Sequence, residues 1–201
     1  SLDLSAFHIK WKDIQLLAEV NDYGVNTNGA GAPADGVEIT AGWRPLRGLR
    51  LSANGAWNKA RLDNDTSPLV GGFKGDRLPF SPKYTAALMA DYRWTIGDTT
   101  PAFVGASARR MVGQYGNFDL DYRTANGRQR EIPSYNVVDA YAGVELGNWT
   151  VEVFGKNLGN SDGKLSTAEH MPNGMFAYPN GALGTGVIAP RTVGFTLTRE
   201  Y

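Results

Sequence analysis

The chain has 201 residues, and its 20 lysines and arginines are balanced by 20 aspartates and glutamates, so it carries no formal net charge at pH 7. This balance provides no basic surface for nucleic acid, and the absence of cysteine excludes a disulfide framework, a thiol nucleophile and a cysteine-bound metal. No apolar run reaches the roughly 18 residues of a membrane-spanning helix, a test that does not detect barrel strands, which are apolar only at alternate positions.

The first predicted strand runs from Leu2 to about Val20. It is apolar-rich, with Phe7, Ile9 and Trp11 alternating against His8, Lys10 and Lys12, and the phase of the alternation then shifts near Asp13. We therefore expect one long strand with a bulge or bend at that point. The glycine- and proline-containing stretch from Asn21 to Asp35 is predicted to be a loop.

The clearest hairpin follows this loop. Gly36–Arg44 and Leu49–Trp57 each alternate apolar and polar residues, and Pro45–Gly48 between them has the composition of a tight turn. Trp43 lies near the turn and Trp57 at the far end, as interface anchors on a membrane-spanning hairpin would.

The rest of the chain continues the alternation of strands and connections. The further predicted strands are Pro82–Thr95, Ala102–Val112, Tyr135–Leu146, Trp149–Asn157 and Arg191–Tyr201. The further predicted connections are the loop Asn58–Ser81, the turn Ile96–Pro101, the loop Gln114–Pro133, the two-residue turn Gly147-Asn148 and the longest loop, Gly159–Pro190.

The last strand has an apolar and a small polar face. Threonine, glycine and glutamate alternate there with apolar residues, which we predict to form a C-terminal assembly strand: Val193, Phe195, Leu197 and Tyr201. Such a strand suits a wall between lipid and water, and a half-buried strand of a soluble sandwich would share the pattern.

The lengths of the connections favour a membrane barrel over a soluble sandwich. Eight strands of roughly 9–12 residues have the length that a tilted strand needs to cross a bilayer. Long loops follow the odd-numbered strands and short turns the even-numbered ones, an asymmetry typical of outer-membrane barrels, whose external loops are long and periplasmic turns short. The sequence therefore predicts an all-β chain of about eight antiparallel transmembrane barrel strands, in one domain spanning residues 1–201.

Four stretches carry a resemblance to a known family: GVEITAGWRPLRGLRLSANGAW, GDRLPFSPKYTAALMADYRW, IPSYNVVDAYAGVELGNWTVEVFGKNLGNSDG and RTVGFTLTREY. In this order they resemble the C-terminal part of TonB-dependent outer-membrane receptors, including the arginine-proline turn, the Asn157-Leu158 pair and the aromatic last residue. The resemblance covers nearly the whole chain.

The resemblance implies a barrel of about 22 strands in the outer membrane of a Gram-negative bacterium, with an N-terminal plug domain inside. It implies active import of a scarce small-molecule nutrient such as a siderophore, cobalamin or glycan, energised through TonB by way of the plug. This chain would hold about the last eight strands and would lack the plug and the N-terminal strands. By itself it is therefore not expected to transport.

Candidate ligand contacts lie in the predicted loops. Six aromatic residues there either stack on a ligand or pack loop against loop: Phe73, Tyr115, Phe118, Tyr122, Phe176 and Tyr178. A row of polar residues is predicted to face the wet interior: Glu38, Arg44, Arg50, Asn54, Lys83, Asp91, Arg93, Asp139 and Glu145.

Other chemistry has little support in the sequence. His8 and His170 are the only histidines and lie far apart, so we predict no metal site built on them. The pairs Asp63/Asp65 and Asp119/Asp121 are read as solvated loop carboxylates in preference to calcium ligands. No nucleophile–base arrangement is apparent, so we predict no catalytic residues, no cofactor and no enzyme activity.

One alternative stays open at this stage. A self-contained eight-stranded outer-membrane barrel, acting as an adhesin or structural protein, would need Leu2–Lys12 to pair with Thr192–Tyr201. A piece of a larger barrel would leave both strands at open edges.

Overall fold

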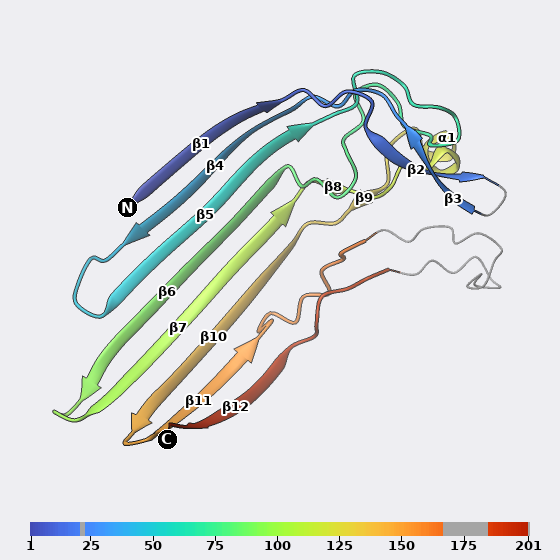
Figure 1. Ribbon diagram of the computed structural model, residues 1–201. Helices are drawn as coiled ribbons and strands as arrows, with labels where there is room; N and C mark the ends of the chain where they lie inside the picture. Colours follow the sequence, from blue (N-terminus) through green and yellow to red (C-terminus); the bar gives the residue numbers. More distant parts are fainter. Residues whose placement is uncertain (21–22, 167–184, 201) are drawn as a thin grey trace, which may run out of the picture.

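The computed structural model of the protein describes residues 1–20, 23–166 and 185–200. Eight strands form its main sheet: β1 (Leu2–Ile9), β4 (Ala34–Trp43), β5 (Leu49–Ala60), β6 (Tyr84–Ile96), β7 (Thr100–Val112), β10 (Tyr135–Leu146), β11 (Trp149–Lys156) and β12 (Thr192–Arg199). They are antiparallel and follow one another in the order β1-β4-β5-β6-β7-β10-β11-β12 (Figure 1). The predicted all-β fold with eight barrel-type strands is confirmed.

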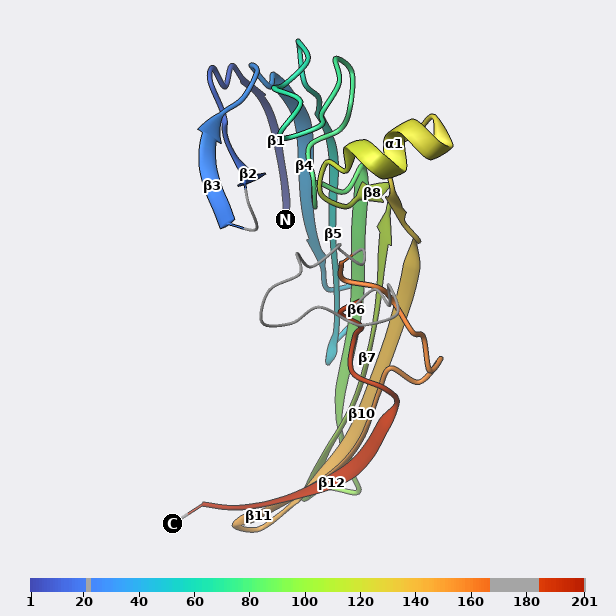
Figure 2. The ribbon, with the colours of Figure 1, turned by 90° about the vertical axis from the view of Figure 1, so that its right-hand side faces the viewer.

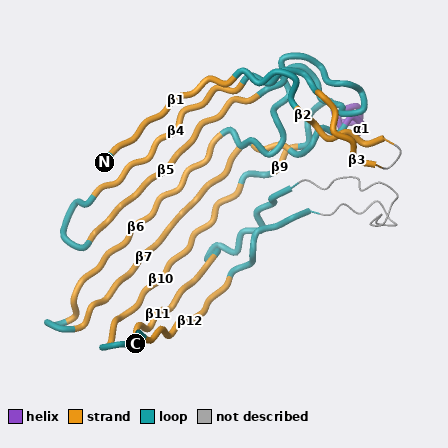
Figure 3. The backbone as a smooth tube through the Cα atoms, in the orientation of Figure 1, coloured by secondary structure: helices purple, strands orange, loops and turns teal. Residues whose placement is uncertain are grey.

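The connections are short at one end of the sheet and long at the other (Figure 3). Two of the short turns reverse the chain at a glycine with positive φ, Gly97 at 60° and Gly147 at 59°, a backbone conformation that favours residues without a Cβ. The sheet is curved when it is viewed from the side (Figure 2), as a section of a barrel wall would be.

The strand register separates two faces, as the alternation predicts. One face, which we call the lipid face, carries exposed apolar residues on every strand except β5, where they are half-buried. These exposed residues include Leu4, Ile39, Leu88, Val138, Val153 and Phe195. Aromatic residues lie towards both ends of this face. Trp43, Tyr92, Trp94 and Trp149 are near the short turns, and Trp57 and Tyr84 are near the long loops. Two aromatic girdles around an apolar band are characteristic of membrane barrels.

The opposite face, which we call the inner face, is polar. Seven of the nine residues predicted there lie on strands and share this face, whereas Arg44 and Lys83 lie just outside the strands. Arg93 and Glu145 form an ion pair at 3.6 Å on this face, and Arg109 and Asp139 form another at 3.5 Å. Phe103 and Met111 of β7 are apolar residues on the inner face, and they interrupt the alternation of apolar and polar residues in this strand.

Aromatic rings cover glycines on the inner face. In four register pairs an aromatic residue lies directly opposite a glycine on the next strand, and a Cβ on that glycine would lie within 3.0 Å of the ring. The pairs are Phe7–Gly36, Phe103–Gly143, Tyr141–Gly105 and Phe154–Gly194. These rings pack across the strands in the space that a side chain would fill.

The predicted long first strand is wrong. The strand β1 ends at Ile9, and Asp13 has a positive φ of 50°, which turns the chain out of the sheet. The following residues form a separate hairpin, β2 (Gln15–Val20) with β3 (Tyr23–Asn28), where a strand end and a loop were expected. The shift of apolar phase near Asp13 therefore marks a break between two elements and not a bulge within one.

The third long loop also contains regular structure. It holds β8 (Gln114–Tyr115), the helix α1 (Leu120–Asn126) and β9 (Glu131–Ile132). Asp119 caps α1 by accepting a hydrogen bond from the backbone N–H of Tyr122, and Gly127 ends it with φ of 67°. Among the described residues, no helix has the length and apolar character needed to cross a bilayer.

The sheet is open. The strands β1 and β12 are its two edges and are not paired with each other (Figure 1). The closed eight-stranded barrel of the alternative reading is therefore not the arrangement found among the described residues.

Candidate functional site

The long connections form a loop layer at one end of the sheet. It consists of the β2–β3 hairpin, the second loop (residues 61–83) and the third loop (residues 113–134), which gather at the same end of the wall (Figures 1 and 2). Ile14, Ala32 and Leu62 form a buried apolar cluster in this layer, and Leu16, Leu78 and Phe118 pack against it. The layer thus has a small hydrophobic core of its own.

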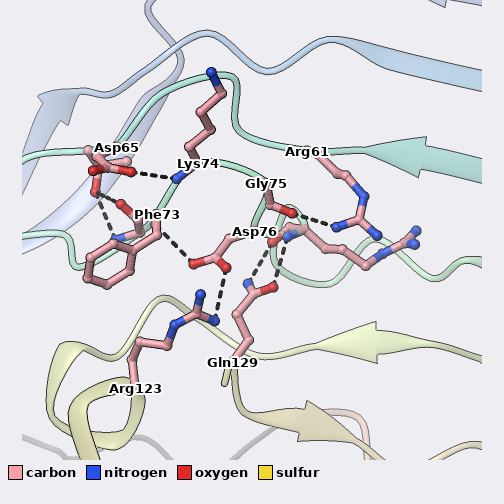
Figure 4. A network of polar contacts seen from close by, with 11 residues as sticks. Arg61, Asp65, Phe73, Lys74, Gly75, Asp76, Arg123 and Gln129 are labelled. Carbon is pink, nitrogen blue, oxygen red and sulfur yellow. Dashed lines mark hydrogen bonds and ion pairs between the residues drawn. The ribbon is translucent and has the colours of Figure 1, made fainter. Parts of the chain in front are cut away.

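Polar contacts join the second loop to the third (Figure 4). The Asp76 carboxylate is buried; it accepts a hydrogen bond from the backbone N–H of Phe73 at 2.9 Å and pairs with Arg123 of α1 at 3.0 Å. The Gln129 side chain accepts from the backbone N–H of Arg77 at 2.8 Å and donates to its carbonyl at 2.9 Å. We call these contacts the loop latch, since they hold two long loops in one arrangement.

The Arg77 side chain lies beneath this latch and is 5% exposed. Its guanidinium donates to the carbonyl of Asn58 at 2.8 Å, and within the described residues its Nε has no hydrogen-bond partner. Burial lowers the pKa of Arg77 from its usual value, and the nearby charge of Arg61 lowers it further. Because the ordinary pKa of arginine is so high, the guanidinium stays charged and places positive charge at the base of the loop layer.

The structure locates four of the six predicted aromatic residues. Phe73 is exposed at 36%, with the Arg123 guanidinium 5.3 Å from its ring centre, and Tyr122 lies 4.0 Å from the Arg130 guanidinium. Phe118 packs on the apolar cluster, and Tyr115 lies in β8, where its carbonyl accepts from Phe80. Phe176 and Tyr178, like Tyr201 of the assembly strand, lie outside the described residues. The role of the six aromatic loop residues in ligand binding stays a prediction.

The predicted acidic pairs are engaged in loop structure. Asp65 accepts from the backbone N–H of Lys74 at 2.7 Å, and Asp119 pairs with Arg130 at 3.0 Å in addition to capping α1. His8 Nδ1 lies 2.7 Å from Asp35 across β1 and β4, whereas His170 lies outside the described residues. In the part of the chain that the structure describes, no three histidine, aspartate or glutamate side chains are grouped to hold a metal ion.

Sequence reasoning missed the residues that fix the base of the last long loop. Asn157 is buried, has a positive φ of 49°, and donates from Nδ2 to the carbonyls of Ser161 at 2.8 Å and Ala189 at 2.9 Å. Its backbone N–H donates to Asp139 at 2.7 Å. Asn157 therefore ties the first and last residues of this loop, which we call its two arms, to the end of β11. The Asn157-Leu158 pair is the feature of the sequence that marks this role.

A hollow of about 570 Å³ lies over the inner face beneath these arms. Glu38, Asn54 and Arg109 line it from the wall, and Leu165 and Ile188 line it from the two arms of the last loop. Charged and apolar groups therefore share a recess on the inner face.

These features define a class: a section of membrane-barrel wall, with one lipid face, one polar inner face and an ordered loop layer at one end. Residues 1–158 match the family described as TonB dependent receptor-like, beta-barrel, and the chain belongs to this family. Members are outer-membrane proteins of Gram-negative bacteria, which locates the chain in that membrane.

Similar proteins agree with this assignment. The chain is 28% identical over 134 residues to the pesticin receptor of Yersinia enterocolitica, a match that covers 67% of this chain and 19% of that receptor. Among solved structures, the ferric yersiniabactin uptake receptor of Yersinia pestis has 23% identity and a TM-score of 0.73, covering 98% of this chain and 27% of that one. The ferric-catecholate import receptor of E. coli K12 has 22% identity and a TM-score of 0.67, covering 98% and 24%. The structural likenesses show the fold.

Proposed function

We propose that this chain forms the C-terminal part of the barrel of an outer-membrane receptor that imports a scarce nutrient, such as a ferric siderophore, with energy supplied through TonB. The observation that carries the proposal is the two-faced wall joined to a latched loop layer at one end. Such a wall separates lipid from a wet interior and presents a fixed surface to a ligand arriving from outside.

The open edges support a larger barrel. An unpaired strand edge in lipid leaves backbone groups without hydrogen-bond partners, so β1 and β12 each require a neighbouring strand. We infer that these neighbours belong to a barrel of about 22 strands with a plug domain against the polar inner face. The alternative, a self-contained barrel acting as an adhesin, would need β1 paired with β12.

The loop layer supports a small-molecule ligand. The rings of Phe73 and Tyr122 offer stacking surfaces, and each lies beside a guanidinium that is already paired with an aspartate. This combination suits an aromatic chelate. The relatives include receptors named for ferric yersiniabactin and ferric catecholates, and this chain is proposed to take a ligand of that general class. We propose no enzymatic activity for it.

Uptake of radiolabelled iron by cells tests this function. A strain without its own siderophore receptors would produce the full-length protein carrying this chain and be offered a panel of ferric siderophores. We expect saturable uptake of at least one, and no uptake in the same strain without TonB. Uptake that continues without TonB would contradict the transport mechanism, and no uptake or binding across the panel would contradict the ligand class.

A pair of variants tests the ligand surface. The substitution Phe73→Ala is expected to weaken ligand binding roughly fivefold, the effect of losing one aromatic contact worth about 1 kcal/mol. Phe80→Ala is the matched control, since Phe80 is a loop phenylalanine of similar exposure, 43% against 36% for Phe73, that was not predicted to contact ligand. Equal effects of the two variants would show that Phe73 has no special role.

A further inference from the structure

The last long loop covers part of the inner face. The hollow of about 570 Å³ described above, which we call the inner hollow, has its floor on the wall, where Thr40, Asn54 and Ala87 are neighbours in the strand register. Leu165 and Ile188, one from each arm of the loop, line its other side. The position of the two arms therefore decides how far the floor is open to the barrel interior.

The two arms are joined to each other by backbone hydrogen bonds. The N–H of Leu165 donates to the carbonyl of Gly186 at 2.8 Å, and the N–H of Ile188 donates to the carbonyl of Gly163 at 2.9 Å. Two segments joined in this way move as one unit, so a single anchor is able to place both of them.

Asn157 is that anchor. Its buried side chain donates from Nδ2 to the carbonyls of Ser161 and Ala189, and its Oδ1 accepts from the backbone N–H of Ser161 at 2.9 Å. Its φ of 49° lies in the left-handed region, which residues other than glycine seldom occupy. Contacts from outside the residue are therefore needed to fix this conformation.

A carboxylate on the wall supplies such a contact. The pairing of β11 with β10 ends at Gly155, and two residues further on the backbone N–H of Asn157 donates to Asp139 Oδ1 at 2.7 Å. A hydrogen bond to an ionised acceptor is roughly twice as strong as one between neutral groups. Asp139 also pairs with Arg109 through Oδ2, but this contact is longer, at 3.5 Å, and the Arg109 side chain is largely exposed, so the pair contributes little.

We propose that Asp139 is a positioning residue: through Asn157 it holds the two arms over the inner hollow, and so limits the size of the molecule that reaches the hollow floor. The inference rests on the proposed import function for its biological role, because only a ligand that passes through the barrel interior meets these arms. The contacts that carry it, from Asp139 to Asn157 and from Asn157 to both arms, do not depend on that function.

Cysteine labelling of the full-length protein in vesicles tests this proposal, because these 201 residues contain no cysteine. Any cysteine elsewhere in the full-length protein would be replaced first. Ala87→Cys puts a reporter on the hollow floor, and Ser52→Cys puts one on the inner face outside the described lining. Each reporter would be treated with the small reagent iodoacetamide or the bulky reagent fluorescein maleimide, and the labelling rates measured by mass spectrometry.

The decisive variant is Asp139→Asn, which keeps the size of the side chain and removes its charge. We expect it to speed labelling of Ala87→Cys by fluorescein maleimide about fivefold, the effect of weakening one charged hydrogen bond to a neutral one. Labelling by iodoacetamide, and both rates at position 52, should stay unchanged. A variant that only destabilised the barrel would raise the rates of both reagents at both positions.

Glu145→Gln is the matched control. Glu145 is also an inner-face carboxylate of β10 and pairs with an arginine, Arg93, at 3.6 Å, but it lies near the short turns, far along the strand from the last long loop. Removing its charge should change none of the labelling rates.

The proposal is overturned if Asp139→Asn gives no rise at position 87, an equal rise at position 52 or an equal rise with iodoacetamide, or if Glu145→Gln gives the same rise. Should Asp139→Asn fail to fold, Asn157→Gly decides in its place. Glycine accepts the positive φ and keeps the N–H that bonds to Asp139, but it releases both arms, so the same selective rise is expected. Labelling needs neither siderophore nor TonB, so its failure and a failure of the import function are told apart.

Discussion

The wall and the loop layer of this protein place their apolar residues in opposite ways. In the wall, Val193 and Phe195 are 74% and 76% exposed, whereas Ile14 and Leu62 in the loop layer are each 2% exposed. The buried apolar cluster therefore belongs to the loops, and the regular sheet turns much of its apolar surface outward. A region solvated by lipid is held by its backbone ladder, and a region solvated by water needs a core and polar latches.

The largest effect is expected from placing a charge on the lipid face. Ala106→Arg puts an arginine in the middle of β7 between Ala90 and Ala140, and should destabilise the folded barrel by about 2–4 kcal/mol. Denaturant titration of the full-length protein in vesicles measures this. Ser107→Arg is the control, since the adjacent residue faces the inner side opposite Asp139 and should cost much less. Equal losses would contradict the assignment of one face to lipid and the other to the wet interior.

A smaller effect is expected from filling the space beneath an aromatic ring. A Cβ at Gly105 would meet the Tyr141 ring, so Gly105→Ala should cost about 1–3 kcal/mol through overpacking. The same titration measures it, and combining Gly105→Ala with Tyr141→Ala should recover part of the loss. Gly159→Ala is the control, because no heavy atom lies within 4 Å of a Cβ there. Purely additive effects at Gly105 and Tyr141 would disprove the packing.

The smallest effect should be confined to the loops. Asp76→Asn removes the charge that pairs with Arg123 and should weaken the loop latch by about 1–2 kcal/mol. Hydrogen exchange should then quicken in the second and third loops while the strands of the wall keep their protection. Asp65→Asn, at an exposed carboxylate in the same loop, should change little. Faster exchange in β6 and β7 would show that the latch also stabilises the wall.

The wall could be predicted from the sequence, because a two-residue period translates directly into two faces. The two faces of the last strand, and the polar inner row, follow from alternation alone, and Val193, Phe195 and Leu197 are all exposed. The sequence does not distinguish the break at Asp13 from a bulge, because the same shift of apolar phase accompanies a bulge and a turn out of the sheet. Its positive φ is the deciding feature, and the sequence does not display it.

The loop layer could not be predicted in the same way. Gln129 bonds to Arg77 across 52 positions of the chain, and no local pattern connects the two. The seven-residue helix α1 is too short to display a helical period, although Asp119 and Gly127 are ordinary cap residues. The aromatic residues were found by composition, while the arginines beside Phe73 and Tyr122 became apparent only from the structure.

The last long loop is anchored at its base, so the residues between its two ends are free to vary. Asn157 fixes both arms, and Lys164 pairs with Val187 between them, so the chain leaves and re-enters the wall at two joined points. Doubling the length of a flexible loop costs only about 0.6 kcal/mol once its ends are set. A lineage of such proteins is thus free to replace the residues between these points, and to change what the loop recognises, while every strand of the barrel stays as it is.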